Sequence, residues 1–172
     1  MRILSLILVV TGLMALIVLA VGYTAEEAYT GETFSTYDNK IGTTWEALTT
    51  VEIIPKAKRG VERVEIIARD KGLVTWKEYL EDGGYRLYRM VSIKEPDRYV
   101  VEMLDSSDGV TGFWDFRLEQ QGHITKVTVR EQSKTADIWI RGLHTFVGRN
   151  IQSRRDLKTL RTALFQDLLN SV

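Results

Sequence analysis

The stretch GFWDFRLEQQGHITKVTV, residues 112–129, gives the clearest indication of the fold of this chain. Apolar and polar side chains alternate on both sides of a short Gln-Gln-Gly-His turn, which is typical of two strands that each bury one face. In the first of them Trp114, Phe116 and Leu118 share a face, because side chains alternate with a period of two. The segment therefore predicts an antiparallel hairpin.

The same pattern repeats upstream of this hairpin. Turn-forming residues recur about every 12 to 14 residues, between runs rich in β-branched and aromatic side chains. Six successive strands joined by short turns predict an antiparallel meander, and the lack of intervening helical patterns excludes a parallel βαβ sheet. The six predicted strands are residues 61–69, 73–80, 85–94, 99–104, 112–119 and 124–131.

A strand and a short helical stretch come before the meander. Residues 32–37 are predicted as the first strand. Residues 39–54 carry apolar side chains at helical spacing, among them Trp45 and Leu48. Pro55 closes this stretch, because the residue before a proline avoids the helical conformation.

A long helix is predicted after the meander, over residues 137–169, and Gly142 and Gly148 are the two points at which its first half can break. This helix is the only element large enough to cover one face of the sheet. We therefore expect an α+β helix-grip architecture, in which a curved antiparallel sheet of about seven strands wraps around a long C-terminal helix and leaves a space between them. The second half of the helix carries one apolar stripe, formed by Leu157, Leu160, Leu164 and Leu168.

The N-terminal segment does not belong to that core. Residues 3–22 contain no charge, and 20 residues at about 1.5 Å per residue give about 30 Å, one hydrocarbon thickness. We therefore expect a transmembrane helix over residues 1–23, a linker over 24–31 and one domain over 32–172.

The charges around this span predict its orientation. Arg2 precedes the span, whereas Glu26 and Glu27 follow it, so the positive-inside rule places the N-terminus in the cytoplasm and the domain outside. The expected location is the cell membrane, with a single pass. The alternative is a signal peptide cleaved near the small residues at 20–22, which would release a secreted domain.

The composition excludes several function classes. The chain has 23 basic and 23 acidic side chains among 172 residues, so it lacks the basic excess typical of nucleic-acid binding. It has no cysteine, which excludes disulfides, thiolate nucleophiles and cysteine-bound metals. His123 and His144 lie far apart in sequence, so no metal site, no cofactor and no catalytic triad are expected.

Three local motifs, in this order, resemble those of a known superfamily. The segment TWEALT at 44–49 looks like an opening helix that follows the first strand, the hairpin at 112–129 is similar to the family hairpin, and residues 140–164 look like a terminal helix with a break. The chain thus resembles the START and plant pollen-allergen superfamily, in particular its polyketide cyclase/dehydrase and lipid-transport branch, often called SRPBCC. The segment VEIIPK at 51–56 lacks the family's aromatic residue, so the entrance to any cavity is expected to differ.

This resemblance implies an apolar cavity between the sheet and the C-terminal helix, which in the family holds lipids, sterols, polyketides or other hydrophobic molecules. We therefore expect a membrane-anchored domain that binds a lipid or a hydrophobic small molecule. The alternative is an accessory subunit of a membrane protein complex, with a filled core. A weaker alternative is a cyclase- or dehydrase-like enzyme, and the sequence favours binding over catalysis.

Three charged residues fall on otherwise apolar strand faces, namely Glu78, Arg89 and Glu131. They can form a buried cluster that orients a polar headgroup or acts in acid–base chemistry. Each can equally lie near solvent at a strand end or in a structural ion pair. A shift of one residue in register would turn each of them outward.

Large aromatic side chains complete the candidate ligand cavity. They are either the lining of a pocket for an apolar ligand or the ordinary filling of a core of this size. With the three charged residues, the predicted cavity consists of Trp45, Trp76, Glu78, Arg89, Trp114, Phe116, Glu131 and Trp139.

Trp139 differs from the other aromatic residues of this set. It stands between Ile138 and Ile140, and three consecutive large apolar residues of a helix cannot all face inward. At least one of them is therefore expected to face a lid, a partner or the membrane surface. A basic group on the following helix either approaches anionic lipid headgroups or is simply solvated; it comprises Arg149, Arg154, Arg155, Lys158 and Arg161.

Overall fold

The structure is a computed structural model that describes residues 2–165. Its helical elements are α1 (Arg2–Thr24), α2 (Ile41–Thr49), the 3-10 turn η1 (Val51–Ile53), α3 (Ile54–Ala57), α4 (Ile138–Val147) and α5 (Ile151–Phe165). Its strands are β1 (Ala28–Tyr37), β2 (Val61–Asp70), β3 (Leu73–Leu80), β4 (Tyr85–Lys94), β5 (Arg98–Ser106), β6 (Val110–Gln121) and β7 (Ile124–Thr135).

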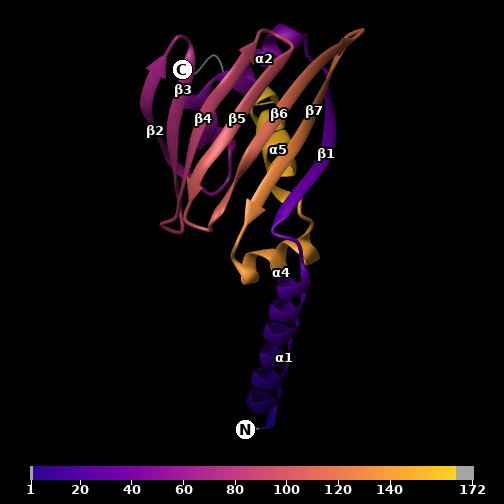
Figure 1. Ribbon diagram of the computed structural model, residues 1–172. Helices are drawn as coiled ribbons and strands as arrows, with labels where there is room; N and C mark the ends of the chain where they lie inside the picture. Colours follow the sequence, from indigo (N-terminus) through magenta and orange to yellow (C-terminus); the bar gives the residue numbers. More distant parts are fainter. Residues whose placement is uncertain (1, 166–172) are drawn as a thin grey trace.

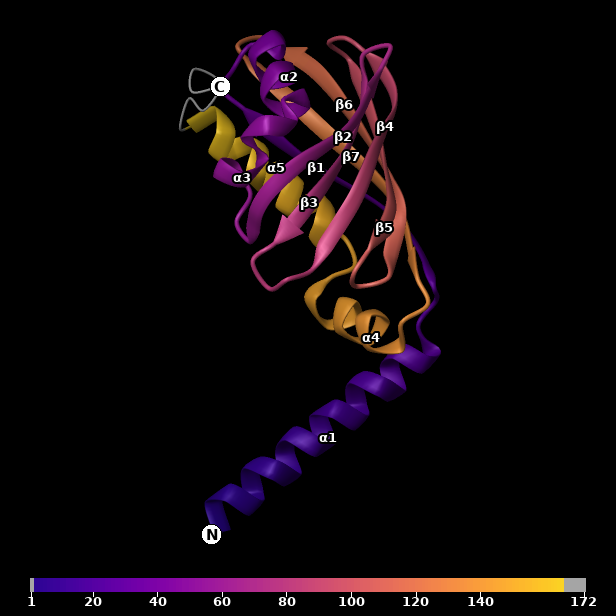
Figure 2. The same ribbon diagram turned by 90° about the vertical axis from the view of Figure 1, so that its left-hand side faces the viewer.

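The strands form one antiparallel sheet in the order β1-β7-β6-β5-β4-β3-β2. The meander of six consecutive strands is confirmed, and β1 completes the sheet beside β7. The hairpin that the sequence singled out pairs Trp114 with Glu131 and Phe116 with Val129 across β6 and β7. The sheet curves around α5, as Figures 1 and 2 show, so the predicted helix-grip α+β fold is confirmed.

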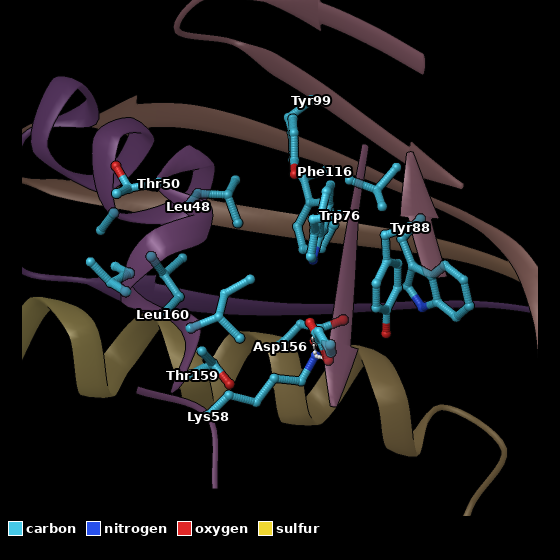
Figure 3. A pocket seen from close by; sticks show the side chains of 16 residues that line it. Leu48, Thr50, Lys58, Trp76, Tyr88, Tyr99, Phe116, Asp156, Thr159 and Leu160 are labelled. Carbon is cyan, nitrogen blue, oxygen red and sulfur yellow. Dashed lines mark hydrogen bonds and ion pairs between the residues drawn. The ribbon is translucent and has the colours of Figure 1, made fainter. Parts of the chain in front are cut away.

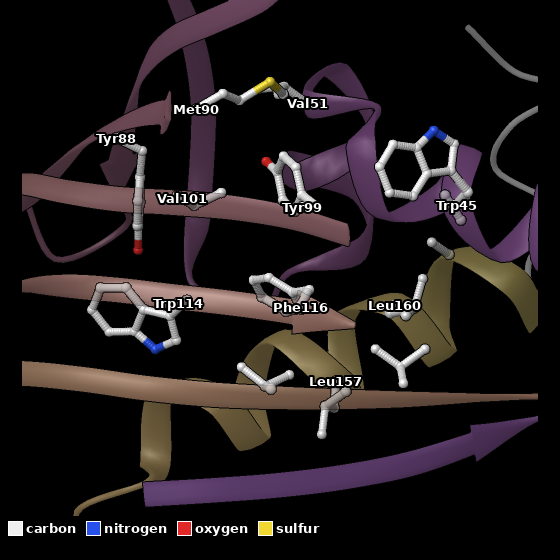
Figure 4. Packing of buried hydrophobic residues seen from close by; sticks show 14 of the residues in the cluster. Trp45, Val51, Tyr88, Met90, Tyr99, Val101, Trp114, Phe116, Leu157 and Leu160 are labelled. Carbon is white, nitrogen blue, oxygen red and sulfur yellow. The ribbon is translucent and has the colours of Figure 1, made fainter. Parts of the chain in front are cut away.

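The core lies between the concave face of the sheet and α5 (Figure 4). Leu157 and Leu160 are buried on the sheet side of α5, as the leucine stripe predicted, and Leu164 packs at the edge of the core. Leu168 lies outside the described residues. The Tyr37 hydroxyl donates a hydrogen bond of 2.7 Å to the carbonyl oxygen of Leu157, which ties β1 to the helix.

The C-terminal helix is divided into two elements. Gly148 has a φ of 95°, a backbone conformation that favours glycine, and it ends α4 at Val147 before α5 begins at Ile151. The Asp137 carboxylate caps α4 by accepting a hydrogen bond of 2.9 Å from the backbone N–H of Ile140. The break lies at Gly148, one of the two glycines at which the sequence allowed it.

The first strand is longer than predicted. Residues 28–31, expected in the linker, belong to β1, because β7 itself continues to Thr135 and pairs Ala28 with Lys134. The connection between α1 and the sheet is therefore reduced to residues 25–27.

Helix α1 is long and apolar enough to cross a membrane, over Ile3–Thr24. A transmembrane span and a signal sequence both have this length and composition. It extends away from the sheet, and its C-terminal end meets α4 (Figures 1 and 2).

Candidate functional site

A cavity of about 80 Å³ lies between the sheet, α5 and the segment from α2 to α3 (Figure 3). Every layer of the domain contributes to its wall. The lining residues are Ala47, Leu48, Thr50, Ile53, Ile54, Lys58, Trp76, Glu78, Tyr88, Tyr99, Val101, Trp114, Phe116, Asp156, Thr159 and Leu160. The volume is enough for several water molecules or a small chemical group.

Aromatic side chains from neighbouring strands build the sheet side of the cavity. Trp76 on β3 and Tyr88 on β4 are directly opposite in the ladder, and their rings stack with centroids 5.1 Å apart and planes 17° apart. Tyr99 on β5 and Phe116 on β6 form the next pair, with ring centroids 5.7 Å apart. The indole N–H of Trp76 is buried and has no hydrogen-bond partner among the described residues.

A buried ion-pair network forms the polar side of the cavity. Lys58 Nζ lies 3.2 Å from Glu78 Oε2 on β3 and 3.2 Å from Asp156 Oδ1 on α5. Gln152, one turn before Asp156, donates hydrogen bonds to Asp156 Oδ1 at 3.1 Å and to the Tyr88 hydroxyl at 3.3 Å. One cation therefore joins two elements across the domain and faces the aromatic wall.

The backbone places Lys58 at this point. Its N–H ends α3 by donating a hydrogen bond of 2.7 Å to the carbonyl oxygen of Ile54, and β2 begins three residues later at Val61. The Lys58 side chain, 8% exposed, points inward between sheet and helix, and Glu78 is only 1% exposed. A buried charge is tolerated when it is paired in this way.

The electrostatics keep Lys58 charged. Burial by itself would lower the pKa of this amine, but the nearby carboxylates of Asp156 and Glu78 outweigh burial and hold the pKa above its ordinary value. Burial also raises the pKa of the Tyr88 and Tyr99 hydroxyls, so both remain neutral hydrogen-bond donors at neutral pH. The site can thus contact an apolar group and hydrogen-bond an acceptor, whereas a Lys58 amine held charged cannot act as a nucleophile.

Four of the predicted cavity residues line this cavity: Trp76, Glu78, Trp114 and Phe116. Trp45 does not line it. Its indole is buried in the core behind the cavity wall and contacts the ring of Tyr99 edge-on, with centroids 6.4 Å apart.

The inward placement predicted for Arg89 is wrong. Arg89 lies on the outer face of β4, where its guanidinium pairs with Glu102 at 2.5 Å. The inward set is Arg86, Tyr88 and Met90, fixed by the pairing of Tyr88 with the buried Trp76. Both faces of this strand carry one arginine and several apolar residues, so alternation alone did not distinguish them.

Glu131 points inward but lies outside the main cavity. Its carboxylate accepts hydrogen bonds from Ser133 Oγ at 2.8 Å and from Ser153 Oγ on α5. Burial raises the pKa of Glu131, although both serine hydroxyls act in the opposite direction. The predicted cluster of Glu78, Arg89 and Glu131 does not form, and the ion-pair partner of Glu78 is instead Lys58.

Trp139 also lies away from the cavity. It is on α4, with 44% of its surface exposed. The described residues contain no group of three or more His, Asp or Glu side chains placed to hold a metal ion.

Several residues of the site were missed by sequence reasoning. Lys58 lies in the short connection between α3 and β2, and Asp156 lies in a helix rich in exposed charges. Tyr99 stood at the start of a predicted strand without being assigned to the cavity. The signal that singles out Asp156 is its position four residues before the buried Leu160, on the same side of α5.

A second hollow of about 540 Å³ adjoins the first and shares Lys58 and Thr159 with it. Its lining carries one carboxylate, that of Asp82, and five cationic side chains. The cations are those of Lys58, Arg59, Arg86, Arg155 and Lys158. The predicted basic group is thus only partly gathered here. Arg149, Arg154 and Arg161 instead donate hydrogen bonds to other parts of the chain.

No family model matches the chain, and no curated protein matches it in sequence. Solved structures do match its fold. The Zhui aromatase/cyclase from Streptomyces sp. R1128 is 13% identical, with a TM-score of 0.67 over 81% of this chain and 93% of that one. A START superfamily protein from Mycobacterium smegmatis is 10% identical, with a TM-score of 0.62 over 81% and 98%. Norcoclaurine synthase from Thalictrum flavum is 9% identical, with a TM-score of 0.61 over 84% and 91%.

These neighbours identify the fold. The chain has the SRPBCC/START-like helix-grip fold, as its sequence motifs indicated. At these identities the likeness concerns the fold and not the ligand or the reaction.

Proposed function

We propose that this chain is a membrane-anchored domain that binds a hydrophobic small molecule or a lipid between its sheet and α5. The observation that supports this most directly is the composition of the cavity wall. Stacked aromatic rings face a buried Lys58 network at one end, which suits a ligand with an apolar body and one polar group. The unpartnered indole N–H of Trp76 offers that polar group a donor.

The basic hollow beside the cavity extends the same argument. Arg155 and Lys158 lie on the side of α5 that faces it, and the described residues include no ion-pair partner for either. A ligand whose apolar part enters the aromatic cavity would place an anionic group toward these cations. The proposed ligand class is therefore amphipathic.

The proposal places this domain outside the cytoplasmic membrane, held by α1. The charges flanking α1 support this orientation. The close packing of α1 on α4 supports a retained anchor, because a signal peptide that is cleaved makes no contact with the mature domain.

Native mass spectrometry of the full chain, released from mild detergent, tests the binding proposal. We expect wild type to retain a bound hydrophobic molecule. Thr50 lies at the cavity wall near solvent, so Thr50→Trp should obstruct the cavity and remove the bound mass. The matched control Thr128→Trp adds the same side chain to the outer face of β7 and should leave the bound mass unchanged.

The volume of the cavity favours a second candidate, an accessory subunit with a filled core. Ligand sites usually measure about 300–1,000 Å³, and this cavity encloses about 80 Å³. A clean mass for wild type, identical in Thr50→Trp and Thr128→Trp, would contradict ligand binding and support this second function.

A further inference from the structure

The contact between α1 and α4 is made backbone to backbone. A Cβ added to Gly142 would collide with the carbonyl oxygen of Val18, and one added to Gly22 would collide with that of Ile138. Glycines allow such close approach between membrane helices. α4 is therefore held directly against the last turns of α1.

Two arginines fix the short connection that follows α1. Arg141 on α4 donates hydrogen bonds of 3.4 Å to the Ala25 carbonyl oxygen and to Glu27 Oε1. Arg149, just after α4, donates to the carbonyl oxygens of Glu26 and Ala28. The orientation of α4 relative to α1 is thus set by the helix crossing and by these contacts with the connection that follows it.

The depth of this crossing follows from the helix rise. Val18 lies six residues before Thr24, the end of the apolar helix, which is about 9 Å at 1.5 Å per residue. If α1 spans the bilayer, α4 must lie at the boundary between lipid headgroups and acyl chains, where interfacial helices bury their apolar faces about 5–10 Å deep.

The exposed face of α4 is apolar and aromatic, as expected for a helix at the headgroup–acyl boundary. Trp139, Leu143 and Phe146 follow one another at i, i+4 and i+7 and form one stripe, and they are 44%, 45% and 58% exposed. Val147 extends the stripe and is 51% exposed. Tryptophan and phenylalanine at such a level are typical of side chains at a membrane–water interface.

Arginines contribute to the polar surroundings of α4. Between α4 and the sheet lies a small hollow whose lining includes Arg86, Arg149 and Arg155, together with the carboxylates of Asp108 and Glu131. Arg86 and Arg155 also line the basic hollow described above, so the two hollows adjoin at these side chains. Cations at this level complement the anionic headgroups of a bilayer.

We propose that α4 is an interfacial helix whose exposed stripe, Trp139, Leu143, Phe146 and Val147, inserts into the headgroup–acyl boundary of the membrane that α1 spans. This rests on one part of the proposed function, the retained anchor, and is independent of any ligand in the cavity. It orients the domain: the end of the sheet that adjoins α4 faces the bilayer.

Trp139 fluorescence in vesicles tests the insertion. The full chain is reconstituted in phosphatidylcholine with a minor fraction of phosphatidylglycerol, with or without brominated phosphatidylcholine as a quencher. The other tryptophans, Trp45, Trp76 and Trp114, are buried in the domain. We therefore expect brominated lipid to quench part of the wild-type emission and Trp139→Phe to lose that quenchable part.

A matched control moves the indole to a surface far from the membrane. Phe34 is 65% exposed on β1, six residues beyond Ala28, which is about 20 Å along the strand. In Trp139→Phe/Phe34→Trp, aqueous iodide on both sides of the vesicle should quench the new indole, and brominated lipid should not.

Two outcomes would overturn the proposal in different ways. If the chain resists alkaline carbonate but Trp139 is quenched by iodide and not by brominated lipid, α4 does not insert and its stripe fits a protein partner instead. If carbonate releases the chain from the vesicles, α1 is not an anchor, and the membrane part of the proposed function fails as well.

Discussion

Lys58 is a buried charged residue, so it needs partners of opposite charge that an apolar side chain at this position would not need. Its ammonium lies between the carboxylates of Glu78 and Asp156, and its distance to the Tyr88 ring centroid is 5.5 Å. Buried networks of this kind add little net stability, since desolvation offsets most of the attraction. Stability alone therefore does not account for this network, and under the proposed function it contacts the polar group of the ligand.

Replacing Lys58 by methionine should destabilise the domain by about 3–5 kcal/mol, because two carboxylates would face each other without their cation. Chemical unfolding of the full chain in detergent, followed by the fluorescence of its buried tryptophans, measures this change. Arg59→Met is the matched control: its side chain is exposed, and we expect almost no effect.

A triple variant tests whether the unpaired carboxylates cause this loss of stability. In Lys58→Met/Glu78→Gln/Asp156→Asn, neutral amides replace both carboxylates. Most of the free energy of unfolding that Lys58→Met loses should therefore be recovered. A triple variant as unstable as Lys58→Met would show that the loss comes from packing of the lysine stem instead.

Strand alternation predicted part of the site at the level of single residues. It placed Trp114, Phe116 and Glu78 on inward faces, because Trp114 and Phe116 alternate with Asp115 and Arg117, and Glu78 follows Val74 and Trp76 at the strand period of two. It misplaced Arg89, since both faces of β4 are mixed. Lys58 and Asp156 were beyond its reach, because only tertiary packing brings the connection after α3 against α5.

At the scale of elements, the strands were the most predictable part of the fold. The bounds of β3 and β4 agree with the predicted ones, because glycine-containing turns and the Glu95-Pro96-Asp97 turn bound them clearly. The added length of β1 and β7 has no local sequence signal, since each strand extends by pairing with the other. The low helix propensity of glycine likewise predicts a break at Gly142. Its position inside α4 is explained only by its close contact with the backbone of Val18 on α1.

The Gly142 contact yields a prediction for the α1–α4 crossing. Gly142→Ala should force α4 away from Val18, at a cost of about 1–3 kcal/mol, because backbone atoms cannot yield as a flexible side chain can. Arg141, whose side chain is only 11% exposed, should then become accessible, and limited trypsin digestion should cleave after it.

Gly12→Ala is the control for this substitution. A Cβ at Gly12, on the same helix α1, meets nothing within 4 Å, so trypsin should leave the Arg141 site as intact as in wild type. Equal digestion of Gly142→Ala and wild type would show that the two helices do not need their close contact.

At the scale of the whole molecule, the fold is specified by pattern rather than by particular residues. Structural neighbours share the helix-grip fold at 9–16% identity. Besides the sheet and α5, this chain has the apolar α1, the α4 that packs on it and arginines at the adjoining end of the sheet. Under the proposed function, these features place the domain at a membrane.

That placement predicts an asymmetric labelling pattern. The chain has no cysteine, so His123→Cys introduces a single thiol into the exposed turn between β6 and β7. The 12 residues of β7 span about 40 Å at the usual strand rise. This turn therefore lies at the end of β7 that is far from α4 (Figure 1). With the domain outside the cytoplasmic membrane, an impermeant maleimide should label His123→Cys in right-side-out vesicles and spare it in sealed inverted ones. A cysteine inserted after Met1 should show the reverse, and the labelled protein should keep the mass of the uncleaved chain.

Labelling of His123→Cys only in inverted vesicles would place the domain in the cytoplasm. A mass that lacks the first 22 residues would mean that α1 is removed and that the α1–α4 crossing is absent from the mature protein.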